Sequence, residues 1–228
     1  SPLLRTELAA AIAARDLTDP GLYSLVEVLA PTLIEFAPPE LAAEAVPRLL
    51  SGAELWCQGF SEPGTGSDLA ALSCRARPDG DPRTAATWVI DGQKVWTSLA
   101  HYSSRCLLLT RTGTPESRHR GITAFLVDMD APGVTVAPLE MINGVREFAE
   151  VFFDGVRVPA SRMLGELNGG WAVAMSILPF ERSSCFWQRI AYLHRRLQLL
   201  VEAAPDGRRS AEAVPEKSRR FLSFYAGE

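Results

Sequence analysis

The pattern of apolar positions divides the chain into a helical block, a strand-rich block and a second helical block. Three helical stretches, separated by proline and glycine, make up the first block: Leu3–Ala14, Leu22–Phe36 and Glu40–Leu50. From about residue 53 to 164, short β-branched and aromatic runs bounded by Gly, Pro and Asp replace the helical period. At Asn168-Gly169-Gly170 the 3.6-residue period returns and continues to Ala204. Separate blocks of helices and strands predict an α+β multidomain protein.

The middle block predicts an antiparallel sandwich or barrel. Asp91-Gly92 lies between Thr87–Ile90 and Lys94–Thr97, and an Asp-Gly dipeptide between alternating runs predicts a tight hairpin. The same pattern recurs around Asp154-Gly155, within Glu150–Val158. Three more segments are strand candidates: Arg105–Thr110, Ile122–Asp128 and Val134–Leu139.

The last helical block predicts one long helix with a single apolar stripe, which needs partner helices. The stripe consists of Phe186, Ile190, Leu193, Leu197 and Leu200. We expect Pro179 to bend this helix or to mark a restart, because proline lacks the amide donor and crowds the preceding turn.

Composition narrows the class of protein. The chain has 228 residues, 47% of them hydrophobic and 22% charged, with a net charge of -4 and no basic cluster, which disfavours nucleic acid or an acidic membrane as a partner. No apolar run reaches membrane-spanning length. The four cysteines are far apart among apolar neighbours, which indicates a reducing compartment and a cytoplasmic location. The three histidines are equally isolated, so we expect no metal site.

A turn rich in glycine and hydroxyl side chains, Phe60–Asp68, is the first candidate for chemistry. Gly64 and Gly66 can take positive φ and let a ligand approach the main chain, and the neighbouring hydroxyls offer hydrogen bonds to carbonyl or phosphate oxygens. Composition alone favours the simpler interpretation, a glycine-rich surface turn.

Two motifs in order carry a resemblance to a known family. A strand followed by Ser61-Glu62-Pro63-Gly64-Thr65-Gly66-Ser67-Asp68 precedes Gly92-Gln93-Lys94-Val95-Trp96-Thr97-Ser98. Further similar segments are Gly121–Val127, Phe153–Pro159, Leu164–Glu166 and Gly169–Trp171. From about residue 20 to 200 the chain resembles the acyl-CoA dehydrogenases.

The resemblance implies three domains. Residues 1–52 are the end of an N-terminal helical domain, and residues 53–164 are a β-barrel or β-sandwich middle domain that binds flavin and acyl-CoA. Residues 165–228 are part of a C-terminal helical domain, the start of an α-helical bundle. Complete members of the family have more helical residues on both sides, so we expect either a partner chain that completes the site or a chain that is a fragment.

The resemblance also implies an FAD site. Phe60 and Ser61 contact the flavin ring through backbone groups and the Ser61 hydroxyl, while Gly66 and Ser67 approach the pyrophosphate or the CoA end of the substrate. Trp96 lies along the flavin, with Thr97 in the same cofactor-binding set and Ser98 near N5. For Trp96, periodicity alone favours a core aromatic on a hairpin.

The family's reaction needs a carboxylate base, and some members place it in a Glu-Arg pair on the first long C-terminal helix. Glu181-Arg182 matches this arrangement, with Glu181 as base and Arg182 as a substrate-binding residue. Ile177 and Cys185 lie one turn away on the same helix face, so we expect desolvation to raise the Glu181 pKa. The alternative is an exposed Glu-Arg pair without a catalytic role.

The function implied is FAD-dependent oxidation of an acyl-CoA to a trans-2-enoyl-CoA, with electrons passed to an electron-transfer flavoprotein. A homo- or hetero-oligomer, dimer or tetramer, is expected. Two alternatives stay open: an oxidase or flavin monooxygenase on the same fold, and a non-catalytic subunit that stabilises a catalytic partner. Straight-chain, branched and sterol side-chain substrates all stay open.

Overall fold

The computed structural model describes residue 11 and residues 20–203. The described residues belong to two compact units, one formed by residues 21–182 and the other containing residues 183–203. Apart from residue 11, the predicted helix Leu3–Ala14 lies outside the described residues, as does the tail after residue 203. The larger unit carries the sheet and the candidate site.

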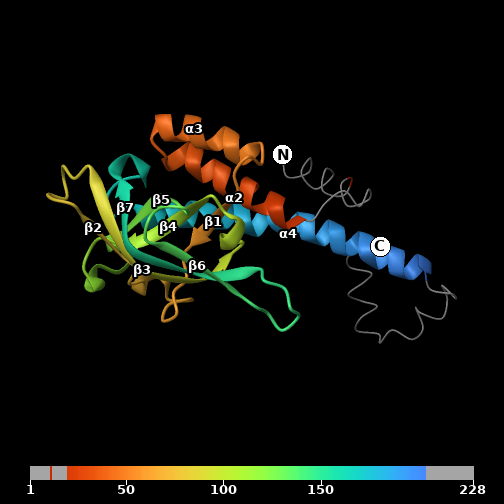
Figure 1. The fold of residues 1–228 in the computed structure, drawn as a ribbon. Helices are drawn as coiled ribbons and strands as arrows, with labels where there is room; N and C mark the ends of the chain where they lie inside the picture. The colour runs from red at the N-terminus through yellow and green to blue at the C-terminus, as the bar shows by residue number, and fades with distance from the viewer. Residues whose placement is uncertain (1–10, 12–19, 204–228) are drawn as a thin grey trace. The chain divides into compact units, whose positions relative to one another are not determined.

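Two helices precede the sheet, as the sequence predicts. They are α2 (Pro20–Phe36) and α3 (Pro39–Leu50), and α3 begins with proline in its first turn, where the missing amide costs nothing. Leu41, Ala45 and Leu49 recur every four residues and form the buried side of α3. Figure 1 shows both helices outside the sheet, and one anchor is the Gly165 N–H, which donates to the Phe36 carbonyl at 2.7 Å.

Eight strands form one mixed, open sheet, and the α+β fold class with flanking helices is confirmed (Figure 1). The strands are β1 (Trp56–Gly59), β2 (Arg75–Pro78), β3 (Thr87–Ser98), β4 (Arg105–Arg111), β5 (Ile122–Asp128), β6 (Val134–Leu139), β7 (Phe148–Pro159) and β8 (Met163–Leu164). Their order is β6-β7-β3-β2-β4-β5-β8, with β1 paired to β4. β1 and β2 run parallel to β4, and all other pairs are antiparallel. Short 3-10 turns, η1 (Leu69–Ala71), η2 (Ala100–Tyr102), η3 (Pro115–Gly121) and η4 (Ala160–Arg162), join the strands.

Neither Asp-Gly dipeptide forms the predicted hairpin. Both lie inside long strands, because β3 and β7 pair with each other from Thr87–Pro159 to Ser98–Phe148. A register shift falls between Ile90 and Gly92, and Gly92 adopts φ +148°. The Asp91 carboxylate also accepts the Gly155 N–H at 2.8 Å, across the ladder. Each dipeptide therefore marks an irregularity in the ladder, where a twelve-residue partner strand overrides the local turn preference.

The long helix α4 (Gly170–Ala203) continues through Pro179 without a break, which excludes the predicted restart, and the alternative of a bend stays a prediction. Its first part belongs to the larger unit, where Val173, Ala174 and Ile177 are fully buried. Further along, Leu193 and Leu200 of the predicted apolar stripe are 65% and 70% exposed. No helix in the described part of the chain is both long and apolar enough to span a membrane.

A buried ion pair in the larger unit joins strand β3 to the turn that follows β1. Lys94 Nζ lies 2.8 Å from Glu62 Oε1, and the two side chains are 0% and 4% exposed. Glu62 also accepts hydrogen bonds from Ser73 N and Oγ, both at 2.7 Å, and from Cys74 N at 2.8 Å. Lys94 donates a second hydrogen bond, to the Phe60 carbonyl at 3.1 Å. The pair therefore connects β3 with the turn after β1 and with the start of β2.

The pKa of Glu62 follows from these contacts. Desolvation raises it, but the Lys94 charge and the hydrogen bonds from Lys94, Ser73 and Cys74 outweigh the desolvation, so the pKa is held below its ordinary value. Glu62 is therefore ionised in the folded protein at neutral pH.

We predict that Gly92→Ala lowers the free energy of unfolding by about 2 kcal/mol, because the added Cβ has to displace backbone. That Cβ would lie 2.6 Å from Cys74 Cα, and φ +148° is unfavourable for alanine. Gly64→Ala is the matched control, since its Cβ meets no atom within 4 Å. Urea denaturation of the apoprotein, followed by tryptophan fluorescence, measures both. Equal losses in the two variants would contradict the packing proposed for Gly92.

A second prediction concerns pH. Because the folded-state pKa of Glu62 is depressed, its stabilisation is complete above the unfolded value of about 4.3 and is lost as pH falls through the lower folded value. Glu62→Gln should therefore destabilise the protein by about 3 kcal/mol at pH 7, where it leaves Lys94 buried without its counter-charge. The difference from wild type should shrink below about pH 4.3. Thermal unfolding across this range measures it, with Glu35→Gln on the exposed side of α2 as control. A difference that stays constant with pH would refute the assignment.

Candidate active site

The two sequence motifs lie side by side in the structure. The Val95 N–H of β3 donates to the Ser61 carbonyl at 2.9 Å, and Lys94 reaches the Phe60 carbonyl next to it. The turn after β1 is thus hydrogen-bonded to β3 at two consecutive residues on each side. The Ser61 and Ser98 side chains are half-buried. The turn that contains Ser61 therefore lies against β3, three residues before Ser98.

The glycine-rich turn closes on itself and leaves its outer side open. Glu62 N–H donates to Thr65 O at 2.9 Å, and Thr65 N–H donates to Glu62 O at 3.0 Å. Gly64 and Gly66 do not adopt the positive φ that the sequence suggests. A Cβ on either would meet no atom within 4 Å, so the packing of the described chain does not require glycine there. The bare backbone and the exposed Ser67 leave space for a ligand to approach.

Trp96 is a surface residue and not the core aromatic that periodicity favours. The β3–β7 ladder has a second register shift between Lys94 and Thr97, and Trp96 adopts φ +57° within it. Its side chain is 61% exposed and contacts the Phe148 ring edge-on, with centroids 5.8 Å apart. A left-handed backbone is unfavourable for a bulky residue, and such strain concentrates at functional positions.

Two hydroxyl groups at this place have no hydrogen-bond partner within the described residues. The buried Thr97 Oγ1 lies in the shifted segment, and the buried Thr65 Oγ1 lies in the glycine-rich turn. Buried hydroxyls are normally paired, so each of the two segments holds one unsatisfied hydroxyl. The exposed indole and the open backbone turn fit the planar ring and polar edge of the flavin that the family resemblance implies.

Glu181 and Arg182 are both exposed on α4. The desolvated neighbourhood predicted for Glu181 is not present in the described chain, although Ile177, one turn earlier, is fully buried. The side chains of Ser184 and Cys185 lie outside the described part. Among the described residues, no hydrogen bond or ion pair joins Glu181 to Ser61 or Ser98, so its role as base stays a prediction.

Arg111 fixes the segment that follows the glycine-rich turn. Its buried guanidinium donates to the carbonyls of Leu72 at 3.1 Å and Ala70 at 2.6 Å, and also to that of Arg118. Desolvation lowers the Arg111 pKa, against the raising effect of the Glu62 charge. Arg118 in turn pairs with Asp68 at the end of the turn. These contacts hold the segment that follows Ser67 in place, from Asp68 to Leu72.

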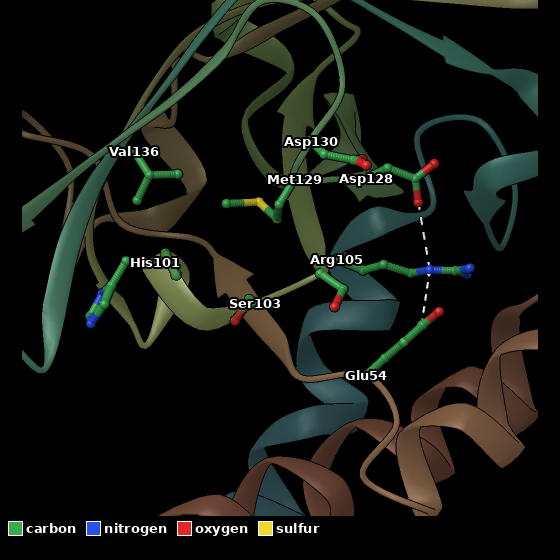
Figure 2. Close-up of a pocket in the computed structure, with 10 residues that line it drawn as sticks. Glu54, His101, Ser103, Arg105, Asp128, Met129, Asp130 and Val136 are labelled. Atoms are coloured by element: carbon green, nitrogen blue, oxygen red, sulfur yellow. Dashed lines mark ion pairs between the residues drawn. The ribbon is translucent and has the colours of Figure 1, made fainter.

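A pocket of about 640 Å³ lies elsewhere, at the other end of β1 (Figure 2). Trp56 at the start of β1 pairs with Arg105, whereas Gly59 at its end pairs with Leu108. The pocket is lined by Glu54, Ala100, His101, Ser103, Ser104, Arg105, Asp128, Met129, Asp130 and Val136. None of the predicted site residues lines it. Figure 2 shows Arg105 between Glu54 and Asp128. Arg105 Nε lies 3.1 Å from Glu54 Oε2 and 3.5 Å from Asp128 Oδ1, and Arg105 also pairs with Glu44 of α3 at 2.6 Å. This cluster attaches α3 to the sheet.

Sequence reasoning gave no role to Lys94 and Glu62, although both lie inside the quoted motifs. The alternation of buried and exposed positions along β3 could have identified Lys94. Trp88 and Ile90 are buried, and Lys94 lies on the same side of the strand. A lysine that alternation places in the core needs a buried acidic partner. Arg105 and Arg111 lie in no motif, and the sequence carries no comparable signal for their partners. Within the described residues, no group of three His, Cys, Asp or Glu side chains could hold a metal.

Comparison with known proteins agrees with this geometry. Residues 57–156 match the family model for the acyl-CoA dehydrogenase middle domain. The acyl-CoA dehydrogenase IpdE1 of Mycobacterium tuberculosis is 49% identical over 198 residues, which are 86% of this chain and 49% of that protein. The chain spans about half the length of this relative and of the Mycolicibacterium smegmatis IpdE1.

Two solved structures share the fold. The Tcur3481-Tcur3483 steroid ACAD is 31% identical with a TM-score of 0.78, over 97% of this chain and 55% of that one. A glutaryl-CoA dehydrogenase from Mycobacterium smegmatis in complex with FADH2 is 25% identical with a TM-score of 0.69, over 83% and 47%. Motifs, sheet and relatives agree, and the chain belongs to the acyl-CoA dehydrogenase family.

Proposed function

We propose that this chain is part of an FAD-dependent acyl-CoA dehydrogenase, which oxidises an acyl-CoA thioester to a trans-2-enoyl-CoA and passes electrons to an electron-transfer flavoprotein. The observation that carries the proposal is the direct hydrogen bonding between the Ser61 turn and β3 just before Trp96–Ser98. The curated relatives named acyl-CoA dehydrogenases and the relative in complex with FADH2 support it.

The roles of the site residues follow the family resemblance. Phe60 backbone groups and the Ser61 hydroxyl bind a carbonyl edge of the flavin ring, Trp96 lies along the ring, and Ser98 bonds near N5. Thr97 belongs to the same cofactor-binding set. Gly66 and Ser67 approach the pyrophosphate or the CoA end of the substrate, which suits an open backbone and an exposed hydroxyl. When bound, FAD supplies the acceptor for the hydride that leaves the β-carbon.

Glu181 is the proposed base that takes the α-proton of the thioester, and Arg182 is a proposed substrate contact. Backbone donors beside the site polarise the thioester carbonyl as negative charge develops. A general base works best with its pKa near the working pH, which requires shielding from water. Because Glu181 is exposed in the described chain, the proposal includes a cover over it from another part of the protein or from a partner subunit.

The proposed assembly is a homo- or hetero-oligomer, dimer or tetramer. The exposed Leu193 and Leu200 on α4 support it, because an apolar helix stripe is stable when another helix covers it. The proposal also includes three domains, with boundaries after residues 52 and 164.

The free, buried thiols of Cys57, Cys74 and Cys106 support a reducing, cytoplasmic location. Burial raises the pKa of the Cys74 thiol to about 11.

Glu181→Gln is predicted to keep flavin bound and to slow flavin reduction by acyl-CoA about a hundredfold to ten-thousandfold, the contribution of a positioned general base. Anaerobic stopped-flow bleaching of the flavin across a panel of straight-chain, branched and steroid acyl-CoAs measures it. Glu35→Gln, an exposed carboxylate on α2, is the control and should leave the rate unchanged. Unchanged bleaching in Glu181→Gln removes Glu181 from the base role. A wild type that binds flavin but never bleaches indicates the non-catalytic subunit.

We also predict that the reduced protein passes electrons to an electron-transfer flavoprotein much faster than to oxygen. Turnover with the flavoprotein, compared with oxygen consumption in its absence, separates the dehydrogenase from the oxidase or monooxygenase. Oxygen uptake at the full turnover rate without another acceptor would overturn the dehydrogenase assignment.

A further inference from the structure

Lys94 contacts the two residues that flank Ser61 in the chain. Lys94 Nζ contacts the carbonyl of Phe60, the residue before Ser61, and the carboxylate of Glu62, the residue after it. The next residue of β3 completes the set, because the Val95 N–H donates to the Ser61 carbonyl itself. Three consecutive residues of the turn are therefore fixed to two consecutive residues of β3.

The strained segment of β3 begins directly after these contacts. Trp96 takes its left-handed φ of +57° two residues after Lys94, and the register with β7 resumes only at Thr97. A strained backbone persists when the surrounding contacts over-determine it. Here Lys94 and Val95 are held by the turn, and Thr97 and Ser98 are held by β7. The directions of Trp96 and Ser98 thus depend on where Lys94 is anchored.

The buried Glu62 carboxylate has a full set of hydrogen-bond partners. Its oxygens accept four hydrogen bonds, from Ser73 N, Ser73 Oγ, Cys74 N and Lys94 Nζ. Apolar side chains of similar volume often stabilise a core as well as a buried ion pair does, but they do not fix the Phe60 carbonyl in one position. The pair therefore fixes the position of the Phe60 carbonyl, which an apolar pair would not do.

We propose that Lys94 and Glu62 are positioning residues, which act through Ser61 and Trp96–Ser98 to fix the spacing of the two segments around the flavin. This inference rests on the proposed function, since the flavin is the group proposed to bind between the two segments. Neither residue is a catalytic residue, because both side chains are buried.

The chain offers a matched pair of double variants. Lys94→Met with Glu62→Gln removes both charges, so no buried charge is left unpaired. Arg105→Met with Glu54→Gln does the same to an ion pair of 3.1 Å whose side chains are 7% and 11% exposed, at the other end of β1. Both variants should lose thermal stability, so stability alone does not distinguish them.

Three measurements on the purified, flavin-loaded protein separate positioning from stability: the FAD Kd, the visible circular dichroism of the bound flavin, and the rate of flavin reduction at saturating acyl-CoA. In the Lys94–Glu62 variant we expect the Kd to rise about tenfold. We also expect changed dichroism bands and reduction about a hundredfold slower, the effect of a misplacement near 1 Å. The Arg105–Glu54 variant should match wild type in all three.

Ser73→Ala keeps the experiment decisive if the first double variant does not fold. It removes one of the four hydrogen bonds to Glu62 and should raise the FAD Kd about threefold, with a small change in dichroism. Wild-type dichroism and reduction rate in every folded Lys94, Glu62 or Ser73 variant would overturn the positioning role while leaving the proposed function intact. A wild-type protein that binds no FAD would overturn both.

Discussion

The candidate site depends on the buried contact between Lys94 and Glu62. Taking two charges out of water costs several kcal/mol per ion, and the cost is offset only where the geometry is good and the remaining hydrogen bonds are made. Both conditions hold here, since Glu62 accepts four hydrogen bonds and Lys94 donates to a carbonyl as well as to the carboxylate. The contact connects the turn after β1, the residues just before β2 and strand β3.

The long β3–β7 ladder explains how one strand serves both the core and the site. It contains two irregularities with different chemistry. At Gly92 a positive φ is unstrained, and the space beside it is filled by Cys74. At Trp96 the same kind of shift places a bulky residue in a left-handed backbone, with its side chain exposed. The irregularity at Gly92 allows close packing against Cys74. The irregularity at Trp96 exposes an aromatic side chain directly before Thr97 and Ser98.

Much of the fold is predictable from the sequence because the apolar runs are short and clearly bounded. The bounds predicted for β5 and β6 agree with the structure, and α2, α3 and β4 lie where their patterns place them. Asp91-Gly92 misled the prediction because a local turn preference is weaker than pairing along a twelve-residue partner strand. The partners of Lys94 and Arg105 were not predictable, since they depend on tertiary register. The surroundings of Glu181 stay a prediction, because helix periodicity identifies a face but not what covers it.

The measurement that most directly tests the proposed site is an experimental structure of the protein loaded with FAD. We expect the isoalloxazine ring between the two segments, with the Ser61 and Ser98 hydroxyls within hydrogen-bonding distance of its polar edge and Trp96 along it. A ring bound elsewhere, such as in the pocket beside His101 and Arg105, or a Lys94–Glu62 contact that is absent when flavin is bound, would contradict the proposal.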